Sequence, residues 1–272
     1  MLASYMKARQ APLKSLEVVS PDVESYLTTV GLYRVLWNIQ DRQSHPMAGS
    51  TYSRLAELDT PFAVETANKE ISLCLRNFDN SSLDPATMRQ FINVIGELHD
   101  NVWSHGKACG FSMIQNYRSY ISFALADSGK GFLRVLQEAG VPGINTHMDA
   151  LKWCLKAGNS STSFRHEDPW AQSIPWDCND SPIPAQVKTF EDEDHHEGLG
   201  LSLLINLITR TSGYLDIISG NAQYEIRDGC RVAETAPVHP WQGVIIRFDI
   251  PCASIRQQEN QEVDSLLSDL LS

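Results

Sequence analysis

The sequence predicts an α/β fold, a two-layer sandwich in which helices cover one face of a mixed β-sheet. Two observations predict it. Apolar positions recur at helical spacing in the segments 84–106 and 199–212, and short apolar runs bounded by Gly, Asn and Asp lie between and after them. The chain has 272 residues, of which 42% are apolar, so it can bury a core without help from disulfides or a metal.

Composition and charge exclude several classes of function. The net charge is −11 and Lys and Arg form no cluster, which argues against direct binding of nucleic acid. The six cysteines are far apart and form no CxxC pair, so we expect reduced thiols. No apolar run approaches the ~20 residues that cross a bilayer, and the first residues lack the apolar stretch of a signal peptide. We therefore expect a soluble, cytoplasmic protein with no membrane partner.

Residues 1–65 form an N-terminal segment whose fold and role the sequence leaves open. The run at 15–19 is typical of a short strand, and 23–39 has the spacing of an amphipathic helix that breaks at Gly31. The pattern becomes clearly helical in the stretch 65–78. We therefore expect a separate domain to begin at residue 66.

The helix at 84–106 carries the first chemically informative pattern. It opens with an Asp-Pro pair, an N-cap residue followed by the proline that suits the first helical position. Its polar residues Glu97, Asn101 and His105 recur every fourth position on one face. The apolar residues lie on another face: Phe91, Ile95, Leu98 and Val102. One side of this helix therefore packs, and the other presents a carboxylate, an amide and an imidazole.

Two strand-like runs follow, at 110–117 and 120–127, and the short interval between them predicts a hairpin. The second run ends in Asp127, and Gly129 and Gly131 come directly after it. A carboxylate at the end of a strand is thus followed by a turn with little side-chain bulk.

The segment 132–197 is long and rich in Pro, Ser, Asn and Asp, apart from two short helical stretches. Segments of this length inside a domain are usually functional loops or disordered. It closes at Gly198, Leu199 and Gly200, where the strongly apolar helix 199–212 begins. Three further strands are expected at 214–220, 222–228 and 243–251.

Each of these three features has an ordinary structural explanation: a solvated helix face, a glycine turn capped by its own Asp, and a tight entry into a helix. Together they suit a nucleotide. Glycines at a helix start let backbone N–H groups approach phosphates. A buried carboxylate such as Asp127 accepts a hydrogen bond from an exocyclic amine. The amide oxygen of Asn101 suits Mg²⁺, and Glu97 one turn earlier could activate water.

The segments VIGELHDNVWSHG, ADSGKGF and EGLGLSLL resemble the N, G1 and G2 boxes of the GHKL superfamily, the Bergerat-fold ATPases and kinases that include histidine-kinase-like ATP-binding domains of bacterial regulators. The resemblance covers residues 66–252 and implies ATP and Mg²⁺ as cofactors. It implies that 132–197 is the ATP lid.

The resemblance also implies a role for individual residues. Asn101 would be the Mg²⁺ ligand and Glu97 the catalytic general base. Asp127 would read adenine, with Gly129 and Gly131 beneath the base. The lid hinge and phosphate cradle would be Gly198, Leu199 and Gly200.

Two departures limit what the resemblance implies. Hydrolysing members often place a Thr on a late strand beside the adenine-binding Asp, whereas this chain has Gly243, Val244, Ile245 and Ile246 there. His45 stands in a loop, so it does not match the phosphoacceptor of histidine kinases. Three hypotheses stay open: a slow ATPase that drives a conformational or dimerisation switch, a Ser/Thr protein kinase of the anti-sigma-factor type, and an ATP-gated interaction module that does not hydrolyse.

Two stretches, 191–197 and 253–272, are acidic. Residues 191–197 include His195, His196 and Glu197, which could form a metal site but more simply form a solvated turn. The tail 253–272 is acidic and amphipathic, so it docks on its own domain or on a partner. We expect a protein partner or a homodimer through the lid, the N-terminal segment or the tail, and lid closure that depends on salt.

Overall fold

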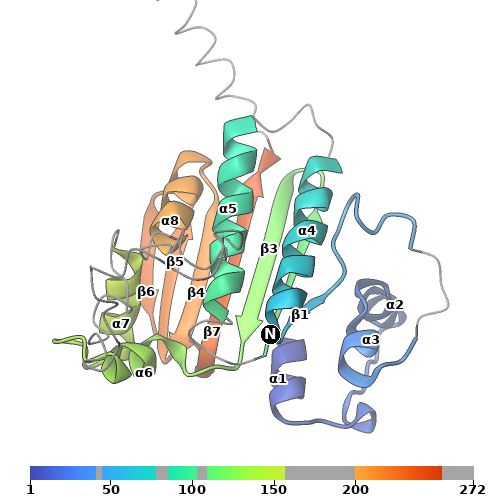
Figure 1. The fold of residues 1–272 in the computed structure, drawn as a ribbon, viewed down its shortest axis with the longest axis horizontal. Coiled ribbons are helices and arrows are strands. Elements are labelled where there is room, and N and C mark those ends of the chain that lie inside the picture. The colour runs from blue at the N-terminus through green and yellow to red at the C-terminus, as the bar shows by residue number, and fades with distance from the viewer. Residues whose placement is uncertain (41–44, 78–84, 103–108, 157–199, 253–272) are drawn as a thin grey trace, which may run out of the picture.

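The computed structural model describes residues 1–40, 45–77, 85–102, 109–156 and 200–252 (Figure 1). Its centre is a seven-stranded sheet with the order β1-β2-β3-β7-β4-β5-β6. The strands are β1 Ala56–Leu58, β2 Gly110–Asn116, β3 Tyr120–Asp127, β4 Tyr214–Gly220, β5 Ala222–Arg227, β6 Arg231–Thr235 and β7 Trp241–Pro251.

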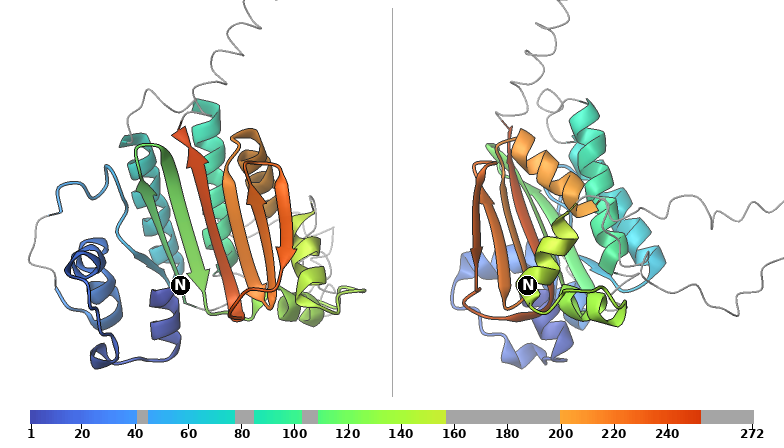
Figure 2. Two further views of the ribbon diagram at one scale, coloured as in Figure 1. Left: turned by 180° about the vertical axis from the view of Figure 1, so that it is seen from behind. Right: turned by 90° about the vertical axis from the view of Figure 1, so that its left-hand side faces the viewer.

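Helices lie around this sheet. They are α1 Leu2–Ala8, η1 Leu13–Ser15, α2 Pro21–Val30, α3 Leu32–Trp37, α4 Pro61–Asn77, α5 Pro85–Asn101, α6 Gly131–Glu138, α7 His147–Leu155 and α8 Gly200–Arg210. Helices α4, α5 and α8 cover one face of the sheet, and α1 to α3 lie beside its β1 edge (Figure 1). Seen from behind, β3, β7, β4 and β5 carry no helix among the described residues (Figure 2). The structure is thus of mixed α/β class, with helices α4, α5 and α8 on one face of the sheet.

The expectation of a mixed sheet is wrong, because every neighbouring pair of the described strands is antiparallel. The chain leaves β3, passes through α6, α7 and α8, and returns in β4, which runs parallel to β3. The last strand, β7, then inserts between these two and pairs with both. A parallel crossover is therefore present in the topology, but no parallel ladder forms.

The core lies between the sheet and the helices that cover it. Strand β3 turns alternate residues such as Phe123 inward, as the two-residue period of a strand requires. Phe248 of β7 stacks on Phe123 with ring centroids 5.0 Å apart and meets Phe91 of α5 at 5.4 Å. The apolar face predicted for α5 is the face that packs in the core, so the polar face of this helix is not part of that core.

The N-terminal segment is helical. The helix break predicted at Gly31 is confirmed, since α2 and α3 meet there and Gly31 has a φ of 85°. The predicted strand at 15–19 is wrong: a single 3₁₀ turn ends at Ser15 and no ladder partner follows among the described residues. A second, smaller core joins these helices to the sheet through residues that include Ala3, Leu32, Leu55 and Phe111.

The structure adds strand β1 before residue 66, and it confirms the two helical stretches predicted near the start of the segment 132–197. Strand β1 precedes residue 66 and pairs with β2, and residue 66 itself lies within α4. Helices α6 and α7 occupy the start of the segment 132–197 and pack through Leu136, Val141 and Ala150. The remainder of that segment, 157–199, and the tail 253–272 lie outside the described residues.

Cys74, Cys109, Cys154, Cys230 and Cys252 are free thiols. None of the helices in the described ranges is long and apolar enough to cross a membrane.

Candidate functional site

Asp127 is a buried carboxylate at the end of β3. Its side chain is held by two backbone amides: the N–H of Gly129 donates to Oδ1 at 2.7 Å, and the N–H of Val244 donates to Oδ2 at 3.2 Å. The residue is only 7% exposed, and this burial raises the pKa of Asp127 to about 6, although the two amides act in the opposite direction. Each oxygen keeps a second lone pair, so the group can accept a further hydrogen bond.

Strand β7 contacts the backbone of Asp127 through Trp241 and Gly243. The indole N–H of Trp241 donates to the backbone carbonyl of Asp127 at 2.7 Å. The backbone of Gly243 passes so close to Asp127 that a Cβ on Gly243 would collide with it. Trp241 and Val244 could not be predicted as partners of Asp127, because Val244 donates through its backbone amide and the indole of Trp241 binds a backbone carbonyl more than a hundred residues away. The available signal was a glycine inside a strand, which often marks close approach of another backbone.

The glycines after Asp127 form a turn packed against the neighbouring strands. Gly129 is buried and supplies one amide to Asp127. Gly131 has a φ of 71°, and a Cβ there would lie 2.5 Å from the carbonyl oxygen of Gln242. The next amide, that of Phe132, donates to the hydroxyl of Ser219 at 3.1 Å. A larger residue at position 131 would therefore displace the turn from the sheet.

The polar face of helix α5 lies against the glycine that begins helix α8. Glu97 is half-buried on this helix, and Asn101 is exposed at its last residue. Gly200 begins α8 directly against Glu97, since a Cβ on Gly200 would lie 2.8 Å from the Cβ of Glu97. Two segments that are about a hundred residues apart in sequence therefore meet at one carboxylate.

The end of α5 also approaches Asp127. Val102 follows Asn101, and its Cγ1 lies 2.7 Å from the position of a Cβ on Gly110, which itself pairs with Asp127 in the sheet. That same Cβ position is 3.5 Å from the Cβ of Asp127. One helix therefore adjoins Asp127 at its end and the start of α8 one turn earlier. Gly198, Leu199 and His105 lie outside the described residues.

His99 lies on the same helix but belongs to the core. It is fully buried, and its Nδ1 lies 2.6 Å from Oδ1 of Asn68 in α4. Since that amide oxygen only accepts, Nδ1 is assigned as the protonated nitrogen. Burial lowers the pKa of His99 to about 3, so the ring is neutral at physiological pH.

Two other charged groups have simpler roles. Lys130, in the turn after Asp127, forms an ion pair with Glu138 at 2.5 Å on the protein surface. No group of three or more His, Cys, Asp or Glu side chains that could hold a metal occurs among the described residues. His195, His196 and Glu197 fall in the undescribed segment. An exposed amide such as Asn101 could hold Mg²⁺ only if phosphates and water supplied the other ligands.

Comparison of the chain with protein-family models, with curated proteins and with solved structures found no match. Its function is therefore inferred from the residues of the site and from the resemblance of its three segments to the GHKL boxes.

Proposed function

We propose that this chain binds Mg-ATP in a GHKL-type site within a two-layer Bergerat fold, and that it is a slow ATPase acting as a conformational or dimerisation switch. One observation carries the proposal. Gly200 at the start of α8 lies against Glu97, and the same helix α5 ends beside Gly110, the ladder partner of Asp127. The three segments that resemble the nucleotide-binding boxes therefore converge on one helix.

The base end of the site fits adenine. Asp127 presents carboxylate oxygens that two amides already orient, and each oxygen retains a lone pair for an exocyclic amine. Guanine carries a carbonyl at the equivalent position, so two acceptors would face each other. The amide of Val244 supplies a donor to Asp127 on the strand where the resemblance would place a Thr hydroxyl. We therefore expect selectivity for ATP over GTP.

The phosphate end of the site fits an anion. Helix α8 begins at Gly200, which is buried against Glu97, and the positive end of an eleven-residue helix lies there. Asn101 offers an amide oxygen to Mg²⁺ at the end of α5. When bound, Mg²⁺ would neutralise phosphate charge and so favour phosphoryl transfer.

Glu97 is the residue we assign to catalysis. It stands one helical turn before Asn101 and against the start of α8, so its carboxylate lies at the phosphate end of the site. A carboxylate in that place can orient a water molecule and take its proton as the water attacks.

Phosphate release from ATP tests this assignment. Glu97→Ala should lose at least about a hundredfold in turnover, the usual size of a general-base contribution, while Mg-ATP affinity stays within about threefold. Equal turnover in the two proteins would contradict the role of Glu97.

Transfer of the phosphoryl group to a Ser or Thr of a partner protein is the second candidate. It is favoured by exposed apolar surface on the N-terminal segment, which suits contact with another protein. The exposed large apolar residues described in this segment are Met1, Leu2, Tyr5, Leu13, Val19, Val23, Tyr26, Ile39, Met47 and Phe62. Incubation with γ-labelled ATP and a co-purified protein would separate the two reactions: label on the partner indicates kinase activity, and label only in free phosphate indicates hydrolysis. A third candidate, ATP-gated binding without turnover, predicts label neither on the partner protein nor in free phosphate.

A further inference from the structure

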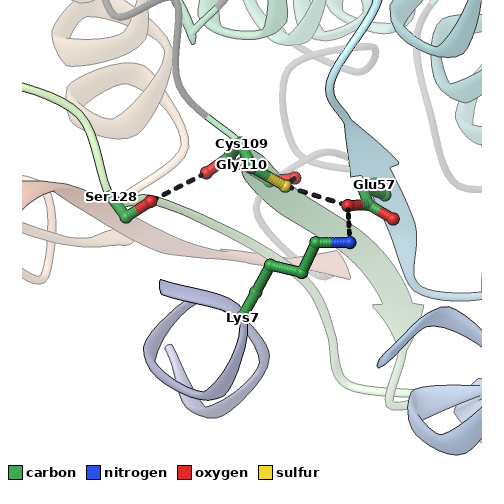
Figure 3. Close-up of polar contacts among 5 residues, drawn as sticks. All are labelled: Lys7, Glu57, Cys109, Gly110 and Ser128. Carbon is green, nitrogen blue, oxygen red and sulfur yellow. Dashed lines mark hydrogen bonds and ion pairs between the residues drawn. The ribbon is translucent and has the colours of Figure 1, made fainter. Parts of the chain in front are cut away.

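A line of polar contacts connects helix α1 to the turn that follows Asp127 (Figure 3). Lys7 of α1 pairs with Oε1 of Glu57 in β1 at 2.7 Å. The thiol of Cys109 donates to the same oxygen at 3.1 Å. At the other end, Ser128 donates twice to the carbonyl oxygen of Cys109, from its amide at 3.3 Å and from its hydroxyl at 3.4 Å.

The sheet register imposes this arrangement. Gly110 pairs with Asp127, so the residues beyond that pair, Cys109 and Ser128, must also lie side by side. Glu57 pairs with Phe111 on the other side of β2, which brings its carboxylate within reach of Cys109. The contacts of Cys109 with Glu57 and with Ser128 therefore follow from the ladder, and Lys7 reaches Glu57 from helix α1.

The protonation states of Lys7 and Cys109 support these contacts at neutral pH. The hydrogen bond to Glu57 is the largest influence on the pKa of Lys7 and raises it, so the ammonium keeps its charge. Burial, followed by the contact with Glu57, strongly raises the pKa of the Cys109 thiol, so it stays protonated and donates. Glu57 is only 21% exposed on its side chain, which limits competition from water.

Apolar packing holds α1 against the same strand. Ala3 of α1, Leu55 and Phe111 belong to one small core, and Cys109 packs against it. Undocking of α1 would therefore remove both the apolar cover and the ion pair from the region next to Cys109.

We propose that Lys7, Glu57 and Cys109 are positioning residues for the nucleotide site, and that docking of α1 and binding of the base at Asp127 are thermodynamically linked. The inference rests on the proposed function. Ser128 stands between Asp127 and Gly129, whose amide orients the carboxylate, so a shift of Ser128 moves that donor. Linkage is reciprocal: if docked α1 favours nucleotide, bound nucleotide favours docked α1 by the same factor.

The first arm of the test needs no ligand. Amide hydrogen exchange is measured at Ser128 and Gly129 in the wild type, in Lys7→Met and in Glu57→Gln, with strand β4 as the internal reference for global stability. Loss of a partly exposed ion pair should speed exchange at the turn by about threefold to tenfold relative to β4. Lys7→Arg should restore slow exchange, and Lys14→Met, which removes an exposed lysine of η1, should leave it unchanged.

The second arm measures Mg-ATP affinity and the effect of Mg-ATP on exchange in α1. Lys7→Met should bind about threefold to tenfold more weakly, with rescue by Lys7→Arg, and saturating Mg-ATP should slow exchange in α1 of the wild type by a similar factor. Unchanged exchange at the turn in Lys7→Met, or unchanged affinity, would overturn the inference. If the wild type binds no Mg-ATP, the linkage and the proposed function both fail, whereas faster exchange at the turn would still show that Lys7 and Glu57 hold Ser128 and Gly129 in place.

Discussion

Asp127 and His99 are both buried titratable side chains, and burial drives each toward its neutral form. The pKa of Asp127 rises to about 6 and that of His99 falls to about 3. Two amide donors surround the first, while one amide acceptor and the ring of Phe123 adjoin the second. At neutral pH Asp127 is therefore mostly a charged acceptor, and His99 is a neutral donor.

The surroundings of the two groups explain this difference. Backbone N–H groups favour a carboxylate and offset part of the desolvation penalty at Asp127, so its charge survives at physiological pH. Nothing among the described contacts of His99 favours an imidazolium. The comparison indicates that burial alone does not mark a functional group, and that donors arranged to preserve a charge are the better sign.

The largest expected effect is on ligand binding. Asp127→Ala should weaken Mg-ATP by about a hundredfold or more, because a charged acceptor and its fixed orientation are both lost. Titrations with ATP and GTP, with and without Mg²⁺, measure this, and the preference for adenine should vanish in the variant. His99→Leu should bind as the wild type does. Unchanged binding in Asp127→Ala would remove the functional side of the comparison.

The next effect is the pH dependence of stability at Asp127. The pKa is near 3.8 in the unfolded chain and about 6 in the folded one, so the folded state takes up a proton first as the pH falls. The unfolding free energy of the wild type, relative to Asp127→Asn, should therefore rise by about 3 kcal/mol in total as the pH falls from above 6 to below 3.8. Denaturant titrations at several pH values would reveal it. A constant difference would contradict the raised pKa.

His99 should show the opposite sign. Its pKa is about 3 in the folded protein against 6.5 when unfolded, so the unfolded chain binds the proton first. His99→Leu should cost about 2 kcal/mol near pH 7, because Asn68 loses its donor. That cost should shrink as the pH falls below 6.5. The same denaturant series measures both variants, and curves of equal sign for Asp127 and His99 would refute the contrast between them.

The smallest expected effect comes from the polar face of α5. Gly200→Ala places a methyl group against Glu97 and should lower phosphate release about tenfold. The control is Gly96→Ala on α5, next to Glu97. Its added methyl group meets no atom within 4 Å, so this variant should keep full activity with slightly higher stability. Loss of activity in both variants would indicate a general effect on α5 instead of a local one at Glu97.

The sequence predicted the elements whose pattern is long and regular. Helix α5, the β2–β3 hairpin and the break at Gly31 all follow from periodicity and turn chemistry. Strand β1 has three residues, too few to show alternation, and β6 is almost wholly exposed, so its residues carry no apolar period. Element signals in a sequence come from the periodicity of buried residues, which neither a three-residue strand nor an exposed strand displays.

The site was predictable in part. Side chains with a distinct chemistry, such as Asp127 and Glu97, stood out by type and spacing, and the structure brings Glu97 against Gly200. The partners of Asp127 on β7 were not predictable, because Val244 acts through its amide and Trp241 lies more than a hundred residues away. The antiparallel sheet was missed for the same reason: the position of β7 is decided by long-range pairing.

Strand β7 is the last described strand to leave the ribosome, yet it lies in the middle of the sheet. Until it emerges, β3 and β4 each expose an unpaired edge, and such edges recruit other chains. The same strand carries Val244 and Trp241, so the surroundings of Asp127 are completed in the step that closes the sheet. A nascent chain would therefore complete the surroundings of Asp127 only when these unpaired edges disappear, and the nucleotide binding that we propose would then report finished folding.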